Sequence, residues 1–279
     1  MKDLQSLSQE LENRLVARNL RGMQQLQKAL RPGYYLRAAR ILNQCQGVVL
    51  IGTGFPVADT FETDGPVGAI ALYQCLEQMG AHPVLVCGNP LYRVLKTDYR
   101  CHPIPVFSDQ DLPAIASEAL QQYLPQAVLS IERPGLAAGD RYYNMRGEDI
   151  TERCASFDYF LKLAACPTIA IGDGGNEIGM GNIKAAVSQL NITPAETECD
   201  ELLLADVSNW GAYGLIALLS LWRQHDYLAT VDPMHILQYL SDRGSVDGVS
   251  RLNTLTEDSL DASEGIALIQ SFRALCGFS

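Results

Sequence analysis

The sequence PTIAIGDGGNEIGMGN, residues 167–182, joins a short apolar run to a loop rich in glycine and polar residues. The apolar run predicts a buried strand, and residues 183–190 predict a helix after the loop. Five glycines allow the loop backbone to approach a ligand closely, and Asp173, Asn176 and Glu177 lie among them. A strand that ends in such a loop and leads into a helix is typical of an α/β ligand site.

The composition of the 279-residue chain argues against several classes of protein. A net charge of −11 without a long basic cluster argues against nucleic acid and anionic membranes as partners. No apolar run reaches the roughly 18 residues of a membrane span, and the N-terminal segment lacks the apolar centre of a signal peptide. Eight cysteines without a CxxC pair argue against a cysteine zinc site and favour a reduced, cytoplasmic compartment.

Strand and helix patterns alternate along most of the chain. Besides the run at residue 167, strands are predicted at residues 47–51, 82–88, 104–107, 127–131 and 201–207. Helices are predicted at residues 34–44, from about residue 64, and at 111–123, 151–165, 183–190 and 212–222. The alternation predicts one three-layer α/β domain over residues 1–279, with a mostly parallel sheet covered by helices on both faces. Leucines at helical spacing make residues 1–44 an N-terminal helical arm.

Four unusual loops follow predicted strands, at residues 52–64, 132–146, 172–182 and 208–211. In a parallel sheet such loops lie along the same edge, beyond the carboxyl ends of the strands. The polar residues that can meet there are Glu62, Asp64, Arg133, Asp173, Asn176, Glu177 and Asn209. Their convergence predicts a polar site rich in carboxylates, with at least one arginine.

Several of these residues have an alternative, structural interpretation. Arg133 and Arg146 are candidates for a carboxylate clamp, because a planar guanidinium binds a carboxylate through two parallel bonds. A local pair between Glu132 and Arg133 is an equally good interpretation. Asp64 also fits a plain helix cap. Arg21 and its two arginine neighbours in the arm are expected on a solvated face, with a reach toward an anionic ligand as the alternative.

The first predicted strand ends in GTGFP, residues 52–56, which is not a dinucleotide fingerprint. Val57 stands where the third glycine would fall, and no Gly-Lys-Ser/Thr follows for a P-loop. We therefore expect no nicotinamide or flavin. Oxygen ligands crowded into the later glycine-rich loop instead predict a weakly held divalent cation near Asp173 and Glu177, with Mg²⁺ or Mn²⁺ preferred over zinc.

Five motifs together resemble the D-glutamate cyclase family, and in particular the C-terminal domain of its mitochondrial members and their stand-alone bacterial relatives. They are ETDGP (62–66), ERPG (132–135), YYNMRG (142–147), GDGGNEIGMGN (172–182) and SNWGAYG (208–214). The resemblance extends from about Arg18 to Gly214, and the GDGGNEIGMG string is its most specific part. It implies the conversion of D-glutamate to 5-oxo-D-proline with loss of water.

Lactam formation requires that the amine lose a proton, that a carboxylate oxygen leave as water, and that the remaining carboxylate be anchored. The acid–base candidates are Asp173, Glu62 and Glu177. The substrate-binding candidates are Arg133, Asp64, Asn176, Gly174, Gly175, Arg146 and Asn209. The expected partner is a small amino acid, and a homo-oligomer is compatible with the sequence. Two other classes stay open: an α/β enzyme that handles phosphates or nucleotides, which the lack of a lysine beside the loop disfavours, and a non-catalytic amino acid sensor.

Overall fold

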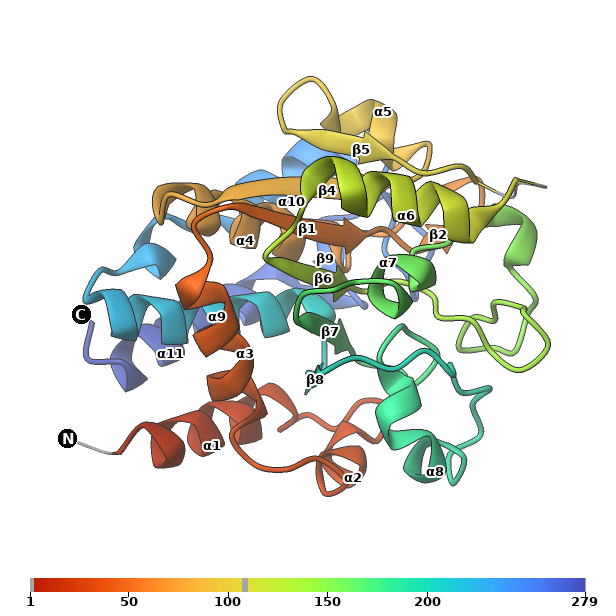
Figure 1. Ribbon diagram of the computed structural model, residues 1–279. Helices are drawn as coiled ribbons and strands as arrows, with labels where there is room; N and C mark the ends of the chain where they lie inside the picture. Colours follow the sequence, from red (N-terminus) through yellow and green to blue (C-terminus); the bar gives the residue numbers. More distant parts are fainter. Residues whose placement is uncertain (1–2, 107–109, 279) are drawn as a thin grey trace.

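The computed structural model describes residues 3–106 and 110–278, and its centre is a six-stranded parallel sheet (Figure 1). The strands are β1 (Val48–Thr53), β4 (His82–Cys87), β5 (Cys101–Pro103), β6 (Ala127–Ile131), β7 (Thr168–Gly172) and β8 (Glu201–Leu204). Their order across the sheet is β5-β4-β1-β6-β7-β8, and every neighbouring pair is parallel. Strand order reverses between β1 and β6, which is where open α/β sheets bind ligands.

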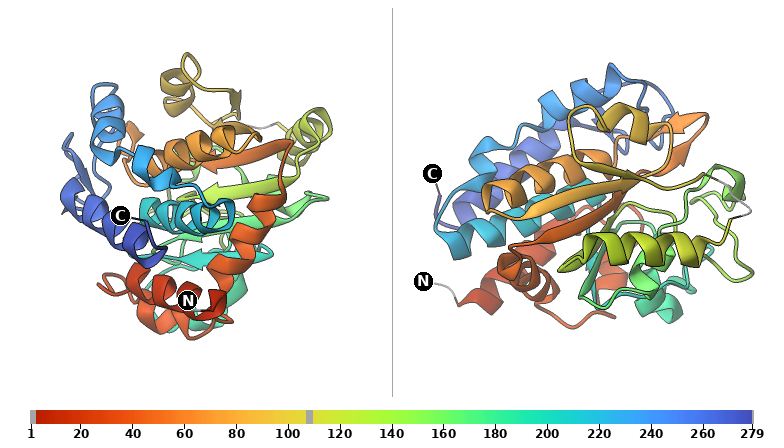
Figure 2. Two further views of the ribbon diagram at one scale, coloured as in Figure 1. Left: turned by 90° about the vertical axis from the view of Figure 1, so that its left-hand side faces the viewer. Right: turned by 45° about the horizontal axis from the view of Figure 1, so that its top comes forward.

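Helices cover both faces of the sheet, as predicted. One face carries α1 (Leu4–Leu15), α3 (Tyr34–Gln44), α4 (Pro66–Gln78) and α9 (Ser208–Arg223), with α10 (Pro233–Ser241) and α11 (Ala262–Leu275) outside α4 and α9 (Figure 2, left). The other face carries α2 (Met23–Gln27), α6 (Leu112–Tyr123), α7 (Asp158–Lys162) and α8 (Lys184–Val187). Side chains alternate accordingly along the strands: Val49 and Ile51 pack on the first face, and Leu50 packs on the second.

Apolar runs and turn residues predicted most of these elements well. The strand at residues 127–131 and the helix at residues 34–44 have the predicted bounds, and Pro66 is the first residue of α4. The predicted α/β fold with its parallel sheet is therefore confirmed. None of the helices in the described ranges combines the length and apolarity that crossing a membrane requires.

Two predicted boundaries are wrong at the sheet edge and after β7. The strand predicted at residues 104–107 is β5, which ends at Pro103, and Phe107 lies outside the described residues. The helix predicted at residues 183–190 is a 3₁₀ turn at Met180–Ile183 followed by the short α8. Short apolar runs beside polar loops carry little information on where an element begins.

The helix predicted at residues 151–165 is also wrong. A 3₁₀ turn at Thr151–Arg153 and the short α7 replace it. Between them Ala155 forms a β-bridge with Val106, and its carbonyl accepts a hydrogen bond from the Arg133 guanidinium. These tertiary contacts hold the backbone extended where local preference favours a helix.

The loop predicted at residues 208–211 is the first turn of α9 instead. Its backbone N–H groups are used there: those of Ser208 and Asn209 donate to the Asp64 carboxylate. This helix start consequently belongs to the candidate site.

Candidate active site

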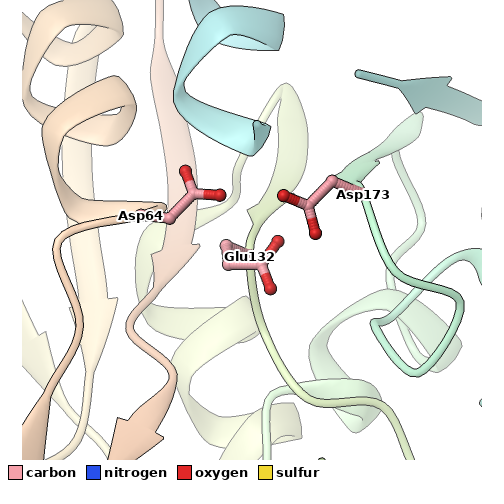
Figure 3. A group of neighbouring side chains, drawn as sticks. All are labelled: Asp64, Glu132 and Asp173. Atoms are coloured by element: carbon pink, nitrogen blue, oxygen red, sulfur yellow. The ribbon is translucent and has the colours of Figure 1, made fainter. Parts of the chain in front are cut away.

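Three carboxylates from separate loops face one another beyond the ends of β1, β6 and β7 (Figure 3). Asp64 precedes α4, Glu132 follows β6, and Asp173 follows β7. One oxygen of each lies within 4.8 Å of the others, and all three side chains are buried. The parallel order of the strands brings these loops to one edge, so Asp64 and Asp173 meet as the sequence predicted.

Backbone amides hold Asp64 in place. Its Oδ1 accepts hydrogen bonds from the N–H groups of Gly65 (2.9 Å) and Asn209 (2.8 Å), and its Oδ2 accepts one from the N–H of Ser208 (2.9 Å). Ser208 and Asn209 begin α9, so the positive end of that helix stabilises the carboxylate. Burial nevertheless raises the pKa of Asp64 to about 6, with a further contribution from the charge of Asp258.

Glu132 occupies a strained backbone position. Its φ of 46° is left-handed, which is unusual for a residue other than glycine, and such strain concentrates at functional sites. The Ser208 hydroxyl donates to its Oε2 at 2.5 Å. Gly65 lies so close that a Cβ there would come within 2.7 Å of the Glu132 Cβ. A glycine at residue 65 therefore makes room for the glutamate.

Arg21 is the cation of the cluster. Its guanidinium forms ion pairs with Asp173 and Asp258, and it donates to the backbone carbonyls of Asp173 and Asp206, each at 3.0 Å. The Asp206 carboxylate accepts the backbone N–H of Arg18 at 2.7 Å and so holds the turn between α1 and α2. The expected solvated face for Arg21 is wrong: the N-terminal arm supplies a residue to the site.

Glu62 is a further buried acid, and its carboxylate has no partner among the described residues. Its side chain is 7% exposed, and within the described ranges its carboxylate has neither a hydrogen-bond donor nor an ion-pair partner. Burial, and after it the charges of Asp258 and Asp64, raise the pKa of Glu62. Burial also raises the pKa of Asp173, against the opposing effect of Arg21. With one guanidinium facing several acids, burial and mutual repulsion favour the uptake of protons or of another cation by the cluster.

A cavity of about 430 Å³ opens onto this cluster, and we call it the acidic cavity. Its walls include the buried acids Glu62, Glu132, Asp173 and Asp258 and the exposed arginines Arg146, Arg153 and Arg251. Arg146 donates to the carbonyl of Val249 and Arg153 to that of Ala58, and neither has an ion-pair partner in the part of the chain that is described. Negative charge is thus buried in the cavity, and unpaired positive charge lies at its mouth.

Arg133 does not lie where the sequence predicted. Its guanidinium donates to the backbone carbonyls of Thr53 (2.9 Å), Gly54 (3.2 Å) and Ala155, and it packs over the ring of Phe157. It lines a neighbouring cavity, not the acidic cavity. The alternative pair with the preceding glutamate is not formed either, since that carboxylate accepts from Ser208. Arg146 does reach the acidic cavity.

The glycine-rich loop binds one of its own acids. Glu177 Oε2 accepts the backbone N–H of Gly175 at 2.7 Å, and burial raises the pKa of Glu177 against that hydrogen bond. Glu177 is therefore turned back toward Gly174 and Gly175 and is not in the group formed by Asp64, Glu132 and Asp173. A metal-binding role for Glu177 with Asp173 and a catalytic role for Glu177 both stay predictions.

The two predicted asparagines have different positions. Asn176 lines the acidic cavity, where its Nδ2 donates to the carbonyl of Tyr143 at 2.9 Å. Asn209 lies behind the cluster, and its Oδ1 accepts the backbone N–H groups of Gly65 (2.8 Å) and Gly68 (2.7 Å) at the start of α4. Asn209 thus supports the loop that presents Asp64 and does not line the cavity.

Reasoning from the sequence missed Glu132, Arg21 and Asp258 as members of the site. Glu132 directly follows a buried strand, as Asp173 does, and that shared position was a usable signal. Asp258 lies in a tight turn between β9 (Thr256–Glu257) and β10 (Leu260–Asp261), with φ of 50°. Its polar turn sequence carries no comparable signal.

Comparisons with known proteins agree with the motifs. Human mitochondrial D-glutamate cyclase is 33% identical over 219 residues, covering 66% of this chain and 34% of the human protein. The chain thus spans about a third of that relative's length. Among solved structures, an exopolyphosphatase-related protein from Bacteroides fragilis superposes with a TM-score of 0.43 at 8% identity, over 87% of this chain and 57% of that one. A mycobacterial protein complexed with NADPH gives 0.29 at 13% identity, over 91% and 62%.

Both structural scores are too low to carry an argument about fold or function. The sequence evidence is stronger: residues 11–273 match the family described as D-glutamate cyclase-like, C-terminal. That match covers nearly the whole chain and includes every motif quoted above. The chain belongs to the D-glutamate cyclase-like C-terminal family.

Proposed function

We propose that the protein is an enzyme that converts D-glutamate to 5-oxo-D-proline with loss of water. Membership of the family supports an enzyme, since the human relative is a D-glutamate cyclase. The observation that carries the substrate class is the charge arrangement of the acidic cavity. Buried acids and unpaired arginines at the mouth complement a molecule with one ammonium group and two carboxylates.

The buried acids are suited to receive the ammonium group. The reaction forms the bond between the amine nitrogen and the γ-carbon and breaks one bond from that carbon to oxygen. Two protons leave the ammonium nitrogen, and the departing oxygen takes up two protons to become water, so no net proton is consumed. Glu62 is our candidate base, because its carboxylate is unpartnered and burial raises its pKa and so its basicity. Burial also raises the pKa of Asp173, which is our candidate for proton transfer to the leaving oxygen when protonated or, when ionised, for holding the cation proposed below.

The arginines at the mouth are suited to anchor the substrate. Arg146 and Arg153 come from different parts of one long loop segment, and each uses only a backbone carbonyl as its described partner. A guanidinium with free N–H groups binds a carboxylate through two parallel bonds. In this proposal Arg146 and Arg153, in place of Arg133, anchor the substrate carboxylates. Asn176 lines the acidic cavity beside the substrate.

We also propose that Asp64, Glu132 and Asp173 hold a divalent cation, in place of the predicted pair of Asp173 and Glu177. The donors fit, because three buried carboxylate oxygens within 4.8 Å suit Mg²⁺ or Mn²⁺. The buried Thr53 hydroxyl, which has no partner in the described ranges, lies beside them: a Cβ at Gly65 would be 2.9 Å from it. When bound, such an ion polarises a carboxylate oxygen and makes the carbon more electrophilic.

Chiral chromatography of the product tests the proposed reaction. The purified chain is incubated with D-glutamate, L-glutamate, D-aspartate or D-glutamine, with added Mg²⁺ or Mn²⁺. We expect 5-oxo-D-proline from D-glutamate and none above background with Asp173→Asn. Thermal stabilisation by amino acids without any product would favour the sensor instead. A preference for nucleotides or phosphate would favour the remaining alternative, which the buried acids oppose by charge.

A further inference from the structure

A second cavity of about 260 Å³ lies beside the acidic cavity, near the ends of β1 and β4. The two share Phe55, Pro56, Ala58 and Arg153 as walls. The second one contains Arg133, which is 2% exposed, so we call it the Arg133 cavity. Of the residues that line it, the proposed cyclisation uses only Arg153, which lies on the shared wall.

Arg133 carries a buried charge that lacks a counter-ion. No carboxylate lies within ion-pair distance of it in residues 3–106 and 110–278. The buried Asp158 acts on it only from a distance, and its own oxygens accept from the N–H of Leu136 (2.9 Å) and the hydroxyls of Tyr142 (2.6 Å) and Thr197. A buried charge without a partner is costly, and backbone carbonyls offset only part of that cost.

The guanidinium also has donors left over. Of its five N–H groups, two on Nη1 donate to the carbonyls of Thr53 and Gly54, and one on Nη2 donates to that of Ala155. Nε has no partner among the described residues, and a second N–H remains on Nη2. A positive group with two spare N–H donors is a match for one carboxylate.

The rest of the Arg133 cavity limits the ligand further. Phe55, Leu91 and Val106 give it apolar walls. Two exposed acids, Asp59 and Glu152, and one exposed arginine, Arg153, also line it. Those acids repel a dianion such as phosphate more strongly than a monoanion, and the walls favour an apolar body. We propose that the Arg133 cavity binds the carboxylate of a small organic monoanion on Arg133, separately from the acidic cavity. The product of the reaction proposed above, 5-oxo-D-proline, is such a monoanion, and that identification rests on the proposed function.

Calorimetric titration tests the subsite without relying on catalysis. The probes are 5-oxo-D-proline, isobutyrate and, as the dianion control, inorganic phosphate. Both monocarboxylates should bind the wild-type chain with similar affinity, because each presents one carboxylate to Arg133. Phosphate should bind about tenfold more weakly or not at all, since two acids face it.

Substitutions in the Arg133 cavity decide the assignment. Arg133→Lys keeps the charge but loses the fork of donors, so monocarboxylate affinity should fall about tenfold or more. Glu152→Gln removes an exposed repulsive charge and should tighten binding about two- to fivefold, whereas the matched exposed change Glu198→Gln should have no effect. If Arg133→Lys does not fold, the Glu152 and Glu198 pair decides alone. No binding of either monocarboxylate, or binding that Glu152→Gln leaves unchanged, overturns the subsite whether or not the chain cyclises D-glutamate.

Discussion

Replacing Asp173 by asparagine separates a chemical role from a structural one. The substitution keeps the side-chain volume but removes the charge and the basicity of the residue. Asp173 directly follows β7, so its backbone is firmly held, and its carboxylate lines the acidic cavity. We expect turnover of D-glutamate to fall about 100-fold or more, which is the scale of losing a proton-transfer group.

The effect on stability follows from the charges around Asp173. The oxygens of Asp173, Asp64 and Glu132 lie within 4.8 Å of one another, and two ionised carboxylates at that limiting separation repel by about 3.5 kcal/mol at an effective dielectric constant near 20. Asparagine removes both repulsions and one attraction to Arg21 of about 4 kcal/mol. Protonation already relieves part of the repulsion. Near pH 8 the free energy of unfolding should therefore stay level or rise, by at most about 3 kcal/mol.

Chromatographic turnover per folded molecule and urea denaturation measure the two effects on the same samples. Asp242→Asn is the control, since Asp242 is an exposed residue at the end of α10 and accepts from Gln238. It should change neither quantity. A large loss of stability in Asp173→Asn with activity per folded molecule retained would refute the reasoning. Asp173 would then only shape the glycine-rich loop, and Glu62 would be the better candidate.

Three further predictions concern the same cluster. Burial raises the pKa of Asp64 to about 6 and that of Glu257 to about 8, so the folded protein keeps protons that the unfolded chain releases. The free energy of unfolding should therefore fall as the pH rises from about 4 to 8, and urea midpoints measured across that range test this. Arg21→Gln leaves Asp173 without its counter-ion and should cost about 2 kcal/mol or more near pH 8. The loss should shrink as the pH falls, because burial raises the pKa of Asp173 and protonation removes its charge; an equal loss at pH 8 and pH 5 would argue against a charge effect. Millimolar Mg²⁺ or Mn²⁺ should raise the melting temperature of the wild type but not of Glu132→Gln, and equal shifts in both proteins would exclude the proposed cation site.

Apolar runs in the sequence predicted which polar residues directly follow a buried strand. Apolar runs located β6 and β7, and the parallel order then brought Asp173 to the same edge as Asp64. The apolar runs did not indicate which of the adjacent residues Glu132 and Arg133 lines the acidic cavity. Glu132 and Arg133 follow the same strand but line different cavities, and the sequence alone did not separate their positions.

Contacts between residues that are far apart in the sequence could not be predicted from local sequence patterns. Arg21 comes to Asp173 only because Asp206 fixes the turn of the N-terminal arm, which lies 185 positions away in sequence. Asp258 comes from a hairpin near the other end of the chain, and the two meet only in the folded protein. Helical spacing in the arm gives no indication of which arginine leaves the solvated surface.

The guanidinium of Arg21 takes the place of a cation bound to Asp173 and Asp258. Asp173 and Asp258 already carry a tethered cation, so an incoming ammonium group or metal ion that binds either of them competes with that guanidinium. Apparent affinity is then a difference between two binding free energies, and the tethered competitor cannot be diluted or washed away. A ligand whose own carboxylates give the displaced guanidinium a new partner lowers the free-energy cost of that competition.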